Sequence, residues 1–216
     1  YTSGQHMTLG GVDKQGRDAT NEASYMMLEA SARLTLHEPP LSLRVHPGMP
    51  DKLWECAVET TKRCGGIPTL QNDEVIIPML EKDGLSLEDA RNYCIIGCVE
   101  PTGTGCHWAA CGGSGKETYW NMANAVLLAI NNGINPLTGK QGPVKTGYLY
   151  DMKSFEEVKQ AYIKIVHYYA DWQVTMTNFY ELVAAEYMPI PMVSATMDGC
   201  MEKGADVTWG GAKYNS

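Results

Sequence analysis

The stretch Gly97-Cys98-Val99-Glu100-Pro101 directly follows an apolar run, residues 93–96, that is typical of a buried strand. It predicts a thiol and a carboxylate at the end of that strand. In an extended chain, residues i and i+2 project to the same side about 6.5–7 Å apart, which leaves room for a small molecule between the two groups. Such a pair suits chemistry at sulfur combined with proton transfer by the acid. The alternative is a buried structural cysteine beside a surface glutamate.

Short strand-like runs alternate with helical patterns on both sides of this stretch. Strands are expected at 7–9, 41–45, 68–70 and 93–96. Helices are expected at 18–36, 50–63, 73–82, 119–131 and 154–187, the last as one helix or two, with a short helix starting near 86 and a glycine-rich loop at 101–116. The alternation predicts an α/β architecture with parallel strands.

The composition is that of an ordinary globular protein. Of 216 residues, 44% are apolar and 19% are charged, which argues against disorder. The 17 basic and 25 acidic residues give a net charge of −8, which disfavours general nucleic-acid binding. No apolar run approaches the ~18 residues of a membrane helix, and no signal peptide is visible, so we expect no membrane association. Seven cysteines, an odd number, favour a reducing, cytoplasmic compartment.

Metal binding is a second hypothesis for the same region. Cys94, Cys98, Cys106, His107 and Cys111 lie within 18 residues, but none of their spacings makes the paired C-x2-C knuckles of a structural zinc site. We therefore expect free thiols and no metal. The rival from another functional class is a non-catalytic zinc-binding module that uses Cys94, Cys106, His107 and Cys111. His107, beside the glycine-rich loop, is otherwise a candidate pocket residue.

The motif at 97–101 resembles the cysteine loop of the glycyl radical enzymes, the pyruvate formate-lyase-like superfamily. It is most similar to the branch with diol dehydratases, choline trimethylamine-lyase and sulfonate lyases. The resemblance extends over nearly the whole chain in the right order. The segments that carry it are 9–11, 18–22, 41–46, 65–68 with 72–73, 88–93, 198–204 and 210–215.

The resemblance implies a fold and a mechanism. The fold is a ten-stranded α/β barrel of two five-stranded halves, with the cysteine loop at its centre and helices around it. A glycyl radical, installed by an S-adenosylmethionine [4Fe-4S] activating enzyme, would take hydrogen from Cys98. The resulting thiyl radical would abstract hydrogen from a small hydroxylated substrate. Glu100 would act as general base while a group leaves through C–O, C–N or C–S cleavage.

The resemblance also implies the setting of the reaction. The family's enzymes are oxygen-sensitive, so we expect an anaerobic host. The resemblance also implies a homodimer of the full-length enzyme in the cytoplasm, or within a bacterial microcompartment. Residues 1–216 would be a fragment of one catalytic barrel domain. The N-terminal half of the barrel and the C-terminal glycyl radical domain, with its Arg-Val-x-Gly-Tyr-like loop, would be absent. We therefore expect this fragment alone to be inactive and to hold no cofactor.

The expected substrate pocket departs from the best-known members of the family. Its candidate residues are Gly4, His6, His107, Trp108 and Cys111. An aromatic residue often stands at the position of Gly4, so the glycine suggests a wider pocket. Alanines and Cys111 follow Trp108, where diol dehydratases and choline lyase carry an acid or a hydroxyl. The runner-up function is C–C cleavage, such as decarboxylation of an arylacetate, for which Gly4 leaves room.

Overall fold

The computed structural model describes residues 6–36, 38–97, 99–108 and 120–215. The chain divides into two compact units. The first contains residues 1–115 and 189–216, and the second contains residues 116–188.

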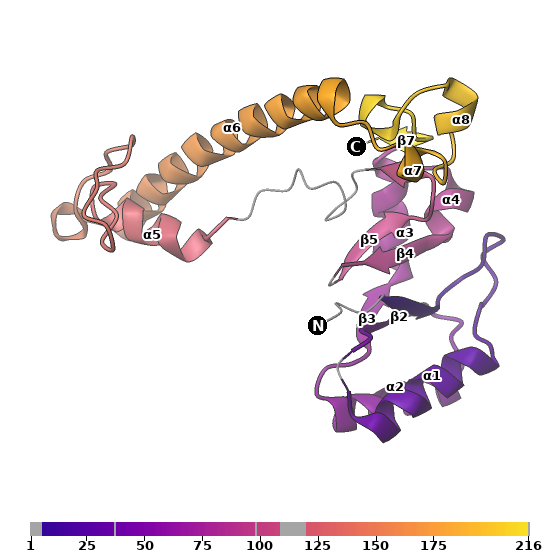
Figure 1. Cartoon of the computed structure of the whole chain (residues 1–216). Helices are drawn as coiled ribbons and strands as arrows, with labels where there is room; N and C mark the ends of the chain where they lie inside the picture. Colours follow the sequence, from indigo (N-terminus) through magenta and orange to yellow (C-terminus); the bar gives the residue numbers. More distant parts are fainter. Residues whose placement is uncertain (1–5, 37, 98, 109–119, 216) are drawn as a thin grey trace. The chain divides into compact units, whose positions relative to one another are not determined.

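The first unit is built on a parallel three-stranded sheet (Figure 1). Its strands are β1 (Met7–Gly10), β2 (Leu41–Val45) and β3 (Thr69–Asn72), in the order β1-β2-β3. Helix α1 (Glu22–Leu34) follows β1, and α2 (Asp51–Cys64) follows β2. The predicted alternation of parallel strands and helices is therefore confirmed in this unit.

Helices α1 and α2 lie side by side and pack against the sheet (Figure 1). Leu28 of α1 and Leu53 of α2 are fully buried in one cluster with Leu41 and Leu43 of β2. Burying each such leucine contributes about 1.5–3 kcal/mol, so this cluster anchors both helices. Helix α1 begins later than the sequence predicts, because the Asn21 side chain caps it by accepting a 3.2 Å hydrogen bond from the Ser24 N–H.

A β-hairpin completes the part of the first unit that carries the cysteine motif. Helices α3 (Asp73–Lys82) and α4 (Leu87–Arg91) lead into β4 (Tyr93–Ile96), which pairs antiparallel with β5 (Glu100–Gly103). The sequence predicted a glycine-rich loop at 101–116, but two strands lie in this range: most of β5, and β6 (His107–Trp108). Strand β6 pairs with β7 (Tyr214–Asn215). The glycines misled the prediction, because Gly103 is in a strand where a Cβ would lie 2.8 Å from the Leu85 side chain.

The C-terminal segment of the first unit is held by a carboxylate of α4. It contains α7 (Pro191–Ser194), α8 (Cys200–Lys203) and the 3-10 helix η2 (Val207–Trp209), and it ends at β7. Asp89 accepts 2.6 Å hydrogen bonds from Lys213 Nζ and from the Tyr214 hydroxyl. These bonds lower the pKa of Asp89 to about 2, so the carboxylate stays charged at neutral pH.

The second unit is helical. It contains α5 (Met122–Ile130), the 3-10 helix η1 (Leu149–Asp151) and α6 (Phe155–Tyr187), a single helix of 33 residues. The pattern that allowed one helix or two is thus one helix, capped by Ser154, which accepts a hydrogen bond from the Glu157 N–H. Ala129 and Ile165 are buried where α5 packs on α6. None of the described helices is long and apolar enough to cross a membrane.

Candidate functional site

A buried ion pair joins the parallel sheet to the hairpin. Arg44 in β2 donates two hydrogen bonds to Asp73, from Nε to Oδ1 at 2.9 Å and from Nη2 to Oδ2 at 2.8 Å. Asp73 is the first residue of α3, where the helix dipole favours a carboxylate. Both side chains are almost completely buried, so each charge depends on the other for compensation.

Tyr93 brings the start of the hairpin to this pair. Its hydroxyl donates a 2.8 Å hydrogen bond to Asp73 Oδ1, and its carbonyl accepts one from Arg44 Nη1 at 3.2 Å. The Arg44 guanidinium also lies 3.9 Å from the centre of the Tyr93 ring, in cation–π contact. Burial, and then the charge of Asp73, raise the pKa of the Tyr93 phenol far above its usual range. The phenol is therefore a permanent donor here.

The turn after β1 closes over the same pair. The Val12 N–H donates to Asp73 Oδ2 at 3.0 Å, and the Val12 carbonyl accepts from Arg44 Nη2 at 3.4 Å. Gly11 has a φ of +77°, and a Cβ there would lie 2.5 Å from Arg44 Nε. Only glycine fits both requirements. The cluster of Gly11, Val12, Arg44, Asp73 and Tyr93 therefore fixes the hairpin relative to the sheet.

The cysteine motif lies at the tip of the hairpin. Ile96 pairs with Glu100, so the chain reverses direction between them, and the extended geometry assumed from the sequence is wrong for this stretch. Gly97 has a φ of +55°. Glu100 Oε2 accepts a 2.8 Å hydrogen bond from the Val99 N–H, and a Cβ on Gly97 would lie 2.7 Å from the same oxygen. The Glu100 carboxylate is thus folded back over the turn. Cys98 itself lies outside the described residues.

His6 reaches this turn from the segment just before β1. Its Nδ1 lies 3.0 Å from the Gly97 carbonyl oxygen, and its Nε2 lies 2.7 Å from Ser42 Oγ. Nearby, the Ile95 N–H donates a 2.9 Å hydrogen bond to Thr8 Oγ1. The structure therefore brings His6 to the motif that contains Cys98 and Glu100, although no motif in the sequence marks this contact.

The other expected pocket residues have packing roles in the described part of the chain. His107 is buried in β6 and its Nδ1 accepts the Gly103 N–H at 3.4 Å. Burial lowers the pKa of His107, which favours the neutral ring. Trp108 packs against the apolar cluster that contains Val207 of η2. Gly4 and Cys111 lie outside the described residues.

A metal site is not formed by the described candidates. Among residues 6–36, 38–97, 99–108 and 120–215, no three His, Cys, Asp or Glu side chains are grouped so that they could hold a metal ion. Burial raises the pKa of the Cys94 thiol and of the Cys106 thiol. Cys94, Cys106 and His107 therefore do not make the zinc module that the rival hypothesis requires, and its fourth ligand, Cys111, lies outside the described residues.

All 216 residues of the chain match the family model described as pyruvate formate lyase-like. The chain belongs to this pyruvate formate lyase-like family. It is 37% identical over 212 residues to (2S)-3-sulfopropanediol dehydratase of Klebsiella oxytoca, covering 98% of the chain and 25% of that protein. It is 34% identical over 221 residues to trans-4-hydroxy-L-proline dehydratase of Clostridioides difficile, covering 100% of the chain and 27% of that protein. The chain thus spans about a quarter of the length of these relatives.

Solved structures of the pyruvate formate lyase-like family share this fold. The glycerol-bound, B12-independent glycerol dehydratase of Clostridium butyricum matches with a TM-score of 0.86 and 40% identity, over 100% of this chain and 27% of that one. A glycyl radical enzyme from Archaeoglobus fulgidus matches with a TM-score of 0.80 and 30% identity, over 97% of this chain and 26% of that one. The prediction that the chain is mixed α/β and forms part of a glycyl radical enzyme barrel is therefore confirmed.

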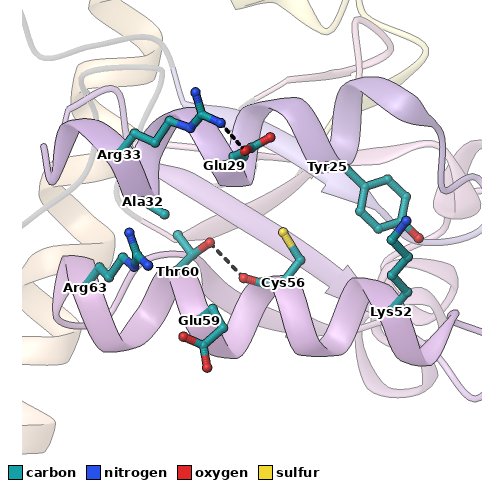
Figure 2. A pocket seen from close by; sticks show the side chains of 9 residues that line it. All are labelled: Tyr25, Glu29, Ala32, Arg33, Lys52, Cys56, Glu59, Thr60 and Arg63. Atoms are coloured by element: carbon teal, nitrogen blue, oxygen red, sulfur yellow. Dashed lines mark hydrogen bonds and ion pairs between the residues drawn. The ribbon is translucent and has the colours of Figure 1, made fainter.

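A groove lies between α1 and α2 in the first unit (Figure 2). Its volume is about 580 Å³, and its walls carry charges of both signs, with Arg33 paired to Glu29. The groove lies in the helical layer, and none of the predicted site residues lines it. The residues around it are Tyr25, Glu29, Ala32, Arg33, Lys52, Cys56, Glu59, Thr60 and Arg63.

Proposed function

We propose that the protein containing this chain is a glycyl radical lyase or dehydratase. It would remove a leaving group from the carbon next to a hydroxyl-bearing carbon of a small substrate. The observation that carries the proposal is the Glu100 carboxylate, which is folded over the turn that contains Cys98 and is bonded to the Val99 N–H. Coupled hydrogen-atom and proton transfer needs a carboxylate near the thiol, and Glu100 follows Cys98 by two residues.

The residues of this chain fit the radical chemistry of the family. The glycyl radical supplies the unpaired electron, which Cys98 receives when it gives up its thiol hydrogen. The Cys98 sulfur then takes a hydrogen atom from the hydroxyl-bearing carbon, forming S–H and breaking C–H. Glu100 takes the hydroxyl proton, and the neighbouring C–X bond breaks with its electron pair leaving on X. The carbonyl-bearing product radical regains a hydrogen atom from the Cys98 thiol.

The names of the relatives support two leaving groups. Dehydratases of sulfopropanediol and of hydroxyproline remove hydroxide as water, and isethionate sulfite-lyase of Desulfovibrio desulfuricans, 32% identical over 209 residues, removes sulfite. For water, the proton taken by Glu100 balances the departing hydroxide. We propose C–O or C–S cleavage ahead of C–N cleavage for this protein, with Gly4 and Cys111 as candidate pocket residues.

The remaining features of the proposal concern the whole protein. Its partners would be an S-adenosylmethionine [4Fe-4S] activating enzyme that installs the radical and a second copy in a homodimer. We propose an anaerobic cytoplasm as its location. The chain would be part of one catalytic barrel domain, with the glycyl radical in a segment that this sequence does not contain.

The proposal is tested by product analysis of the full-length protein activated under anaerobic conditions. The panel contains 3-sulfopropanediol, trans-4-hydroxy-L-proline, glycerol, 1,2-propanediol, isethionate and an arylacetate. We expect water or sulfite elimination with a carbonyl product from at least one substrate that carries a hydroxyl on the carbon next to the leaving group. Release of CO2 from the arylacetate alone would instead support the alternative function, C–C cleavage. The chain is 30% identical to indoleacetate decarboxylase of Tractidigestivibacter scatoligenes, which is consistent with that alternative.

A further inference from the structure

We infer that His6 is a positioning residue: it holds the turn that contains Cys98 by the Gly97 carbonyl, and a hydrogen-bond relay across the parallel sheet fixes its ring. The inference rests on the proposed function of Cys98. It concerns a residue that acts on the reaction through the backbone of the turn, without touching the reacting atoms.

The contact with Gly97 defines which nitrogen of His6 carries hydrogen. A carbonyl oxygen only accepts hydrogen bonds, so Nδ1, 3.0 Å away, must be the donor. The contact joins residues 91 positions apart in the sequence. It therefore ties the segment before β1 to the residue that immediately precedes Cys98, at a glycine whose φ is +55°.

The opposite nitrogen of His6 is held by a chain of side chains that runs through β2 and β3. In the tautomer with hydrogen on Nδ1, Nε2 accepts from Ser42 Oγ at 2.7 Å. Ser42 Oγ in turn lies 2.6 Å from Thr69 Oγ1, which accepts from Gln71 Nε2 at 3.4 Å. Ser42 is fully buried and Gln71 is nearly so. When Thr69 donates its hydroxyl hydrogen to Ser42, and not to the Leu41 carbonyl 3.5 Å away, the chain is directed toward His6 and fixes its tautomer and ring orientation.

Both ring nitrogens of His6 are thus occupied by the protein, which leaves neither for a substrate. On the far side of Cys98, the Val99 N–H is held by Glu100. The backbone is therefore fixed on both flanks of the cysteine, by His6 through Gly97 and by Glu100 through Val99. Hydrogen transfer between carbon and sulfur depends steeply on such placement, and a misplacement of about 1 Å costs on the order of 100-fold in rate.

Two substitutions separate the functions of the two nitrogens. The amide nitrogen of asparagine falls near the position of Nδ1, so His6→Asn keeps a donor for Gly97. The amide of glutamine falls near Nε2, so His6→Gln keeps the link to Ser42 and loses the donor. Ser42→Ala is a third variant, which keeps His6 but removes the group that fixes its tautomer.

The measurement uses the full-length protein, activated anaerobically and transferred to D2O. Once the Cys98 thiol has exchanged its hydrogen for deuterium, reversible transfer to the glycyl radical would place deuterium on the glycine. The collapse of the proton splitting in the EPR spectrum reports this transfer, and no substrate is needed. The amount of radical, measured in the same spectrum, reports whether each variant folds and is activated.

We expect His6→Gln to slow the collapse roughly 10–100-fold at an unchanged radical yield. His6→Asn should stay within about threefold of wild type, and Ser42→Ala should fall between the two. Equal rates for His6→Gln and wild type would overturn the inference, and so would an equal loss in His6→Asn and His6→Gln. If His6→Gln carries no radical, the Ser42→Ala rate decides, since a wild-type rate there refutes the relay. The role of Cys98 is tested separately by Cys98→Ser, in which the proton splitting should persist at an unchanged radical yield, and a collapse as fast as that of wild type would refute that role before any other variant is compared.

Discussion

Glu100→Gln in the activated full-length protein should lower kcat for elimination by about 10²–10⁴-fold, the usual contribution of a general base. The amide has the shape of the carboxylate, and its oxygen can still accept the Val99 N–H that Glu100 accepts at 2.8 Å. The turn should therefore keep its geometry while the hydroxyl proton has no acceptor. The measurement is the initial rate of product formation beside the radical yield by EPR.

A control variant separates this effect from a general loss of charge. Glu88 in α4 is exposed and pairs with Lys14 at the surface, so Glu88→Gln should leave the rate near that of wild type. Glu100→Gln should also still pass hydrogen between Cys98 and the glycyl radical. Turnover by Glu100→Gln within a few-fold of wild type would remove Glu100 from the mechanism.

Asp73→Leu should lower the free energy of unfolding of the first unit by about 3–5 kcal/mol, because it leaves the Arg44 guanidinium buried without its counter-ion. The Tyr93 hydroxyl and the Val12 N–H would lose the acceptor they share. Since this cluster joins the hairpin to the sheet, the cysteine turn should be displaced as well. The measurement is the midpoint of urea-induced unfolding of the full-length protein.

The double variant Arg44→Met with Asp73→Leu gives this prediction a sharper form. Removing both charges leaves no uncompensated ion, so the double variant should recover a large part of the stability that Asp73→Leu loses. The exposed pair Glu29–Arg33 is the matched control, and Glu29→Gln should shift the midpoint only slightly. If the loss of unfolding free energy in the double variant equalled the sum of the losses in Arg44→Met and Asp73→Leu, the two charges would not depend on each other, and the account of the pair would be contradicted.

The sequence patterns predicted those elements in which hydrophobic period and capping signals agree. Strand β2 matches its predicted range, and α3 begins at Asp73, directly after its Asn72 cap, as expected. The strands β5 and β6 were missed because Gly103 lies within β5 and Gly105 lies two residues before β6, and Gly103 is needed for close packing under Leu85. Local periodicity does not reveal pairing with a strand more than 100 residues away, as β6 has with β7.

The sequence also predicted only part of the candidate site, again because contacts between distant segments leave no local pattern. The motif around Cys98 and Glu100 was visible because it is contiguous, whereas its supports come from distant strands. Arg44 left one signal, a charged residue inside the otherwise apolar or small-residue strand β2. A charge at such a position predicts a buried partner but does not identify it. His6 was expected in the substrate pocket, but its contact with Gly97 left no signal, since that contact depends on how β1 meets the hairpin.

The most direct measurement of the central claim compares Cys98→Ser with wild type in the same anaerobic preparation of the full-length protein. A serine O–H bond is too strong to exchange its hydrogen with a carbon-centred radical, whereas a thiol S–H bond is close in strength to the C–H bonds involved. We predict that Cys98→Ser acquires the glycyl radical signal at a yield near that of wild type and forms no product from any substrate that wild type converts. Product formation by Cys98→Ser at a rate near that of wild type would contradict the account.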